Sequence, residues 1–235
     1  WLFWRHEAFD SQRIQADRNP RPGQLRTEIL RSMRSLTIYS FIAVFCYWCF
    51  KNGYSMVDWR YIGGGKVIIS TLVLMFAYDT WFYWVHRLIH WKPLYRRIHK
   101  QHHESFTPTP WASYSFSMTE AVVQCPLWVL CFVFPSHPMA VLIGLFVQNI
   151  YDTFGHLGYE FFPRWMLRNS MVCSVQATPT HHDAHHRFML GNYGHYFNIW
   201  DFLLRTELKQ YKPMREEMYD HAAEPADAER NKSPG

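Results

Sequence analysis

The stretch His86-Arg87-Leu88-Ile89-His90 decides the fold of this chain, together with two related stretches that follow it. The second is His99-Lys100-Gln101-His102-His103, and the third is His181-His182-Asp183-Ala184-His185-His186. Histidines three or four residues apart share one face of a helix. Each stretch therefore predicts a helix that presents several imidazoles in one direction.

The repeated spacing predicts a metal site. Nine of the fourteen histidines lie in the three stretches. Crowded imidazoles repel one another when protonated and need many partners when neutral, and a bound cation answers both problems. One zinc ion takes only three or four protein ligands, so eight or more histidines predict two ions. Imidazole suits iron, copper, nickel and zinc alike, so the histidines leave the element open.

Further short sequence motifs accompany the histidines. They are Tyr83-Trp84-Val85-His86-Arg87, Leu94-Tyr95-Arg96-Arg97-Ile98-His99-Lys100, Gly155-His156-Leu157-Gly158-Tyr159-Glu160, Asn192-Tyr193-Gly194, Phe197 and Trp200-Asp201. With them, residues 79–206 resemble the membrane fatty acid hydroxylase/sterol desaturase superfamily. One departure is Ser117-Met118-Thr119-Glu120, where many sterol-acting relatives carry His-Pro-x-Glu. This departure weakens assignment to a particular sterol subgroup.

The resemblance implies a cofactor and a reaction. Two iron ions would use O2 and external electrons to hydroxylate an unactivated C–H bond of a lipid, of sterol or fatty-acyl type. Desaturation by the same site is the alternative. The electron donor would be a b-type cytochrome or a ferredoxin with its NAD(P)H reductase. Zinc stands above ferrous iron in the Irving–Williams order, so overproduced protein can carry zinc.

The expected metal ligands are the clustered histidines together with His156, which the resemblance adds. They are His86, His90, His99, His102, His103, His156, His182, His185 and His186. His181 and Glu160 are possible further ligands. No catalytic residue is expected beyond the metal centre.

Four polar residues are expected to support the ligands by accepting N–H groups from them, which fixes the ring tautomer. They are Asp79, Asp152, Asp183 and Asn192. Asp79 precedes His86 by seven residues, or two helical turns, and Asp152 precedes His156 by four. His195 either approaches the site or packs elsewhere.

Three apolar runs predict an all-α integral membrane protein. They are residues 36–50, 67–85 and 121–151, and Pro135-Ser136-His137-Pro138 divides the last into two halves. A spanning helix needs ~20 apolar residues, so the halves form a spanning or a re-entrant hairpin. We expect about four transmembrane or re-entrant helices and a cytoplasmic helical cap that holds the dinuclear metal site.

The topology follows from counting crossings. Two spans cross out and back, and the hairpin returns to its own side, so all the histidine stretches share one face of the membrane. Seven arginines in residues 1–34 and the basic residues around the first two stretches lie on that face. Basic flanks mark the cytoplasmic side. The membrane would be the endoplasmic reticulum in a eukaryote and the inner membrane in a bacterium.

The rest of the chain fits a single domain, residues 1–235. Residues 1–34 form a basic arm, in which 24–34 could lie on the membrane as an amphipathic helix, and polar residues 213–235 predict a disordered tail. A net charge of +5 is too weak to suggest nucleic acid. Two functions of other classes stay open: a membrane zinc hydrolase, and a metal transporter or store.

Overall fold

The structure, a computed structural model, describes residues 6–61, 63 and 65–221. Its regular elements in this part are helices, and extended pairing is limited to three isolated bridges. The helices in chain order are η2 (His6–Gln12), α1 (Gln24–Lys51), α2 (Lys66–Ile89), α3 (Lys92–Tyr95), η3 (Pro110–Tyr114), α4 (Met118–Val123), α5 (Leu127–Phe132), α6 (Pro138–Gly155), α7 (Arg164–Arg168), α8 (Ser170–Val175), α9 (Pro179–Phe188), α10 (Ile199–Leu203) and α11 (Tyr211–His221).

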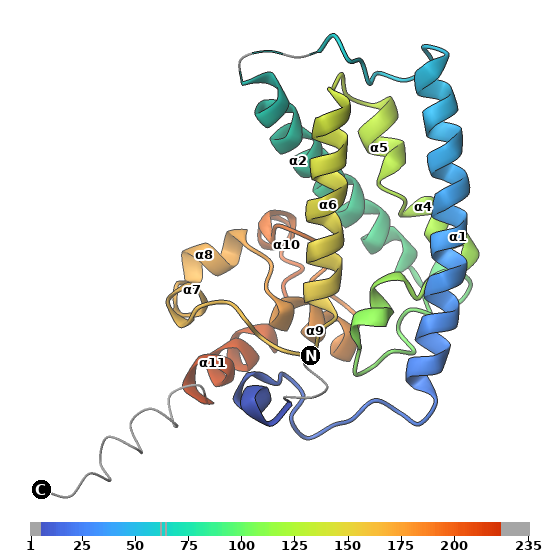
Figure 1. Cartoon of the computed structure of the whole chain (residues 1–235). Coiled ribbons are helices and arrows are strands. Elements are labelled where there is room, and N and C mark those ends of the chain that lie inside the picture. The colour runs from blue at the N-terminus through green and yellow to red at the C-terminus, as the bar shows by residue number, and fades with distance from the viewer. Residues whose placement is uncertain (1–5, 62, 64, 222–235) are drawn as a thin grey trace, which may run out of the picture.

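Helices α1, α5 and α6 run alongside one another, α2 slants across them, and the short C-terminal helices gather at one end (Figure 1). We call α1, α2, α5 and α6 the lengthwise helices. Among the described residues, α1 and α2 are long and apolar enough to cross a membrane. Side chains such as Phe41, Ile68 and Phe146 are more than 60% exposed on α1, α2 and α6. An exposed apolar surface of this kind suits contact with lipid.

Helix α1 is longer than the sequence predicted. The expected surface helix over 24–34 and the expected span over 36–50 are one continuous helix. Its first turns are held by the second histidine stretch and the loop that follows it. Arg31 donates to the carbonyl of Gln101, and Ser32 Oγ donates to the carbonyl of Trp111. Glu28 is buried there and accepts a hydrogen bond from Thr109. These contacts explain why the segment packs on the protein.

The third apolar run folds as a hairpin whose first half is broken. Pro126 separates α4 from α5, and α6 forms the second half. The hairpin turn lies next to the α1–α2 connection, where Asp58 N–H donates to the carbonyl of Ser136 at 2.9 Å. This turn is at the opposite end of the lengthwise helices from α9 (Figure 1). His137 therefore lies far from the histidine-rich stretches.

The prediction of disorder from residue 213 onward is wrong for residues 213–221. Tyr211, Arg215 and Met218 are buried along α11, which packs against α9 and α7. Charged residues dominate the helix, but its few large side chains lie on one face and are enough to dock it. The rest of the predicted tail, residues 222–235, lies outside the described residues.

Candidate metal centre

Helix α9 carries three of the candidate ligands and has a well-defined start. The Thr178 side chain accepts the N–H of His181, and Pro179 occupies the first helical position. Both features stabilise a helix N-terminus. The ten-residue helix then buries His185 and His186 completely.

Five histidines from three elements converge on one point. They are His86, His90, His99, His103 and His185, and one ring nitrogen of each lies within 4.8 Å of the others. The Nε2 atom of His103 is 3.0 Å from that of His99 and 3.2 Å from that of His90. His185 Nε2 is 3.1 Å from His103 Nε2. We call this set the five-histidine group.

A second set lies beside the first. It consists of His102, His156, His182 and His186, again with one ring nitrogen each within 4.8 Å of the others. His156 Nε2 is at its middle, 3.0 Å from His182 Nε2 and 3.2 Å from His186 Nε2. We call this set the four-histidine group. Together the two groups contain all nine residues that the sequence proposed as ligands.

The nitrogen separations fit metal ions. Ring nitrogens bound ~2.0–2.1 Å from a common ion lie roughly 2.8–3.4 Å apart for bond angles between 90° and 110°. Eight pairs of Nε2 atoms within the two groups lie 3.0–3.4 Å apart. Where the proton is on Nδ1, two facing Nε2 atoms have no hydrogen to share, and a cation at each centre would satisfy their lone pairs.

Backbone carbonyls hold several rings in place from behind. The Nδ1–H of His185 donates to Gly191 at 2.7 Å, and that of His86 donates to Tyr193 at 3.0 Å. In the four-histidine group, His156 donates to the carbonyl of Asp152 at 2.6 Å. A proton on Nδ1 leaves the Nε2 lone pair directed at the centre, which is the ligating form.

The carboxylate of Glu120 orients the His99 ring in the same way, although the sequence did not predict this residue. Its Oε1 accepts the His99 Nδ1–H at 2.5 Å, and both side chains are buried. Ser117 caps α4 and accepts the N–H of Glu120, which fixes the carboxylate on that turn. The His-Pro-x-Glu pattern of the relatives ends in a Glu at this position. The chain lacks the His and the Pro of that pattern, so the sequence alone did not indicate a role for Glu120.

Burial keeps the imidazoles neutral. It lowers the pKa of His99 to about 3 and the pKa of His156 to about 4. Burial and the nearby His86 ring hold the pKa of His185 well below its ordinary value. A neutral ring keeps the lone pair that a metal needs, so the folded chain presents its donors ready to bind.

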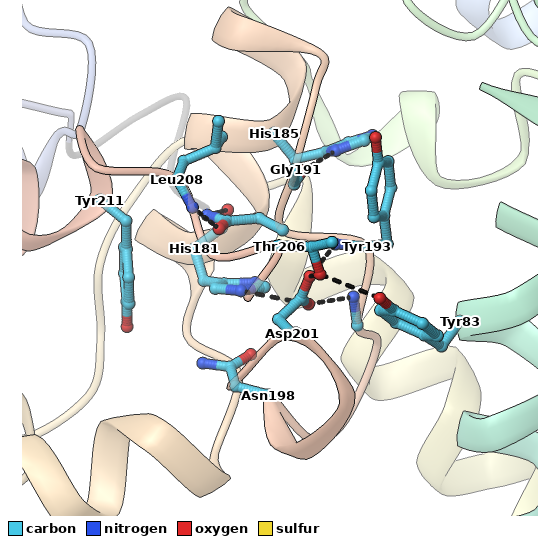
Figure 2. A network of polar contacts seen from close by, with 12 residues as sticks. Tyr83, His181, His185, Gly191, Tyr193, Asn198, Asp201, Thr206, Leu208 and Tyr211 are labelled. Carbon is cyan, nitrogen blue, oxygen red and sulfur yellow. Dashed lines mark hydrogen bonds and ion pairs between the residues drawn. The ribbon is translucent and has the colours of Figure 1, made fainter. Parts of the chain in front are cut away.

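Asp201 organises the loop that braces the five-histidine group (Figure 2). Its Oδ1 accepts the N–H of Tyr193 at 2.9 Å, and its Oδ2 accepts the N–H of Gly194 at 2.7 Å. Thr206 Oγ1 also donates to Oδ1, at 2.7 Å. The loop held in this way supplies the two carbonyls that accept from His86 and His185.

Two glycines let the loop pass close to its neighbours. Gly191 has φ +153°, and a Cβ atom there would lie 2.5 Å from the carbonyl oxygen of Thr206. A Cβ on Gly194 would lie 2.3 Å from the carbonyl oxygen of Phe197. Both distances are far below van der Waals contact, so any larger residue would displace the loop.

Both histidine groups lie within a segment that matches a known protein family. The fatty acid hydroxylase family model matches residues 71–206, a segment that contains all nine group members and Asp201. The chain belongs to the fatty acid hydroxylase family. No solved structure matches it.

Several curated relatives of this fatty acid hydroxylase family member have names that refer to sterol substrates. The chain is 32% identical to human lathosterol oxidase over 76% of its length and 59% of the relative. It is 35% identical to methylsterol monooxygenase erg25B of Aspergillus fumigatus over 55% of its length and 44% of the relative. A Saccharomyces cerevisiae sterol 5(6)-desaturase is 28% identical over 77% of the chain and 48% of the relative. The matched region thus spans about half of the length of these relatives.

The two possible additional ligands lie outside both groups. The carboxylate of Glu160 accepts from Thr180 Oγ1 at 2.7 Å and from the N–H of Phe162 at 3.0 Å, so it supports the start of α9. His181 lies on the other side of α9, where its Nε2 is 3.7 Å from Asp201 Oδ2 and its ring packs on Tyr211. Adjacent helical residues point ~100° apart, which explains why His181 and His182 diverge.

The four expected supporting residues brace the site through the backbone and through other side chains. Asp79 accepts the N–H groups of Tyr196 and Phe197, and Asp183 accepts from Gln15. Asn192 Nδ2 donates to the carbonyl of His181. Their carboxylates and amide do not contact a ligand imidazole among the described residues, which corrects the predicted contact. The backbone carbonyl of Asp152 accepts a hydrogen bond from His156, and its carboxylate accepts one from His195.

A cavity of about 240 Å³ opens beside the two groups. Members of both groups line it: His86, His99, His102, His156 and His182. Its other walls are largely aromatic and include Phe82, Phe116, Phe154 and Phe162. Pockets that enclose a drug-sized ligand usually measure ~300–1,000 Å³, so this cavity suits one end of a long apolar molecule.

Proposed function

We infer that this chain is the catalytic part of a membrane-bound di-iron oxygenase that hydroxylates an unactivated C–H bond of a sterol-type lipid. The reaction uses O2 and electrons from an external donor. The observation that carries this proposal is the pair of convergent imidazole groups beside an aromatic cavity. Membership of the fatty acid hydroxylase family supports it.

Iron fits the donor set. Each group would hold one ion, the five-histidine group through His86, His90, His99, His103 and His185, and the four-histidine group through His102, His156, His182 and His186. Imidazole nitrogen suits iron, and the two adjacent groups leave no carboxylate among the ligands. When bound, the iron pair supplies the O2-derived oxidant that a C–H bond requires and that no side chain provides. The protein aims the nitrogens, keeps them neutral and surrounds the cavity with apolar rings.

The substrate class follows from the cavity and the relatives. A narrow aromatic cavity admits the reacting end of a rigid apolar lipid. Lathosterol oxidase, methylsterol monooxygenase and sterol desaturase are all named for sterols. Desaturation remains the second candidate, because relatives named for each reaction match this chain.

We place the metal centre at the cytoplasmic face of a membrane crossed by α1, α2 and the α5–α6 hairpin. Lipid-facing side chains on the lengthwise helices support this placement. The exposed cations Lys92, Arg96, Arg97 and Lys100 follow α2 on the histidine side. Basic flanks of this kind mark the cytoplasmic end of a span.

An acidic electron-carrier protein, such as a b-type cytochrome, would meet this same basic segment. The ring of Tyr95 lies under it and packs on three members of the five-histidine group. Its centroid is 5.6 Å from His90, 5.8 Å from His103 and 6.2 Å from His99. Opposite charges steer such partners together. The proposal therefore puts electron entry at α3, away from the cavity.

The deciding experiment uses purified protein loaded with ferrous iron, a sterol, reductant and ¹⁸O2. Hydroxylation gives a product that carries one ¹⁸O atom, whereas desaturation gives a product two hydrogens lighter without ¹⁸O. A zinc-loaded sample is the matched control and should be inactive. Turnover with zinc in the absence of O2 would establish a hydrolase. Metal binding without oxygen uptake in any lipid extract would leave a metal-binding protein.

A further inference from the structure

His195 lies in the cavity wall but belongs to neither histidine group. Its side chain is 6% exposed, and its Nε2–H donates to Asp152 Oδ1 at 2.7 Å. A neutral ring that donates from Nε2 has an acceptor lone pair at Nδ1. That Nδ1 atom is buried and has no hydrogen-bond partner among the described residues.

The ring is held rigidly. Asp152 Oδ2 accepts from Tyr114 Oη at 3.2 Å and also from Gln148, so the carboxylate that orients His195 is itself fixed. The His195 ring packs at 4.8 Å on Phe82 and at 4.4 Å on Tyr196. The unpaired nitrogen therefore cannot turn away to find water.

A buried acceptor without a partner calls for a donor, and because His195 lines the cavity, the occupant of the cavity is the candidate donor. Asp152 next to the ring repels an acidic head group. A hydroxyl is the neutral lipid group that donates one short hydrogen bond. We propose that His195 accepts a hydrogen bond from the hydroxyl group of a lipid alcohol, the substrate class of this site. The inference rests on the proposed function, which fills this cavity with lipid.

The position of His195 gives this contact a role in choosing the carbon that reacts. Phe82 touches both His195 and His86, at 4.8 and 5.0 Å between ring centroids. Asp152 reaches His195 with its carboxylate and His156 with its carbonyl. A single residue therefore separates His195 in space from His86 of the five-histidine group, and another separates it from His156 of the four-histidine group. A rigid alcohol held there presents a carbon at a fixed number of bonds from its hydroxyl.

The test measures binding and needs neither O2 nor reductant. Zinc-loaded protein in lipid nanodiscs is titrated with radiolabelled cholestanol and with its deoxy analogue cholestane. Wild type should bind cholestanol about ten-fold more tightly, the worth of one buried hydrogen bond. His195→Phe keeps the ring packing and should bind both equally. Tyr151→Phe is the matched control, because it removes a polar group, the Tyr151 hydroxyl, from another residue of the same wall, and it should keep the preference.

Two results would overturn the proposal: no preference in wild type, or an unchanged preference in His195→Phe. If His195→Phe does not fold, Asp152→Ala tests the same contact, because it removes the acceptor that orients the His195 ring. The cholestanol preference of wild type is measured in either case. Failure of the proposed function is separate, since it appears as absent O2-dependent product in iron-loaded wild type. If both proposals hold, iron-loaded His195→Phe should oxidise the sterol at a mixture of positions.

Discussion

At the scale of single residues, the division of the histidines into two groups is the central result. His102 and His103 are neighbours in sequence but belong to different groups, and so do His185 and His186. In α9, successive residues point ~100° apart, so His185 and His186 serve different centres. His102 and His103 lie in hydrogen-bonded turns after α3, so the helix that their spacing predicted is not formed there. The sequence predicted which nine residues to examine. It could not predict their partition, because that depends on how three separate elements are placed.

The first prediction concerns the ligands. His185→Ala in the five-histidine group and His102→Ala in the four-histidine group should each abolish turnover, because each removes a metal bond. His137→Ala is the control, since His137 is at the distant hairpin turn, and it should retain most activity. Product formation per mole of protein is the measurement. Loss of activity in His137→Ala equal to that of the other two would contradict the ligand assignment.

The second prediction concerns Asp201, which touches no ligand but holds the loop behind His86 and His185. Asp201→Asn should weaken metal binding by roughly 10–100-fold, the usual cost of disturbing groups behind a ligand. The effect should be confined to one ion, because the four-histidine group is braced elsewhere. Metal analysis after dialysis against a weak chelator should give about one ion per chain.

Asp58→Asn is the matched control for Asp201→Asn. Asp58 is an acid of the α1–α2 connection, at the far end of the molecule, where it pairs with Arg60. This variant should keep the metal content of wild type. Full metal content in Asp201→Asn as well would show that the loop does not position the rings.

At the scale of helices, the apolar runs predicted the lengthwise elements well, because hydrophobic length is a local property. The exact extents of the helices were harder to predict. Residues 24–34 continue α1 because Glu28 and Ser32 find partners in a loop about 80 residues away. The helix over residues 211–221 depends on docking against α9 and α7. Such long-range contacts leave no periodic signal in the segment itself.

The third prediction tests the arrangement of the helices in the membrane. Lys100→Cys and Asn52→Cys place a single exposed thiol at each end of the helical bundle, since the native cysteines are all buried. A membrane-impermeant maleimide should label the first from the cytoplasmic side and the second from the opposite side. Labelling of both from one side would rule out a crossing by α1 and α2.

At the scale of the whole molecule, two adjacent groups predict two metal ions per chain. Fully loaded protein should contain two ions, and activity should need iron in both groups. Metal analysis paired with turnover after anaerobic iron reconstitution measures both quantities. Zinc-loaded protein from the same preparation is the control. A stoichiometry of one ion in fully loaded protein would refute the dinuclear proposal.

The hydrogen bond between Gln15 and Asp183 has a consequence for how the protein is made. Asp183 and the bracing Asp201 are synthesised more than 160 residues after Gln15. A nascent chain that ends at Phe188 already contains all nine histidines, yet it lacks the loop that aims His86 and His185. The four-histidine group has its own braces and does not need this loop. We therefore expect the five-histidine group to reach its metal-binding geometry only after translation has passed the loop and Asp201.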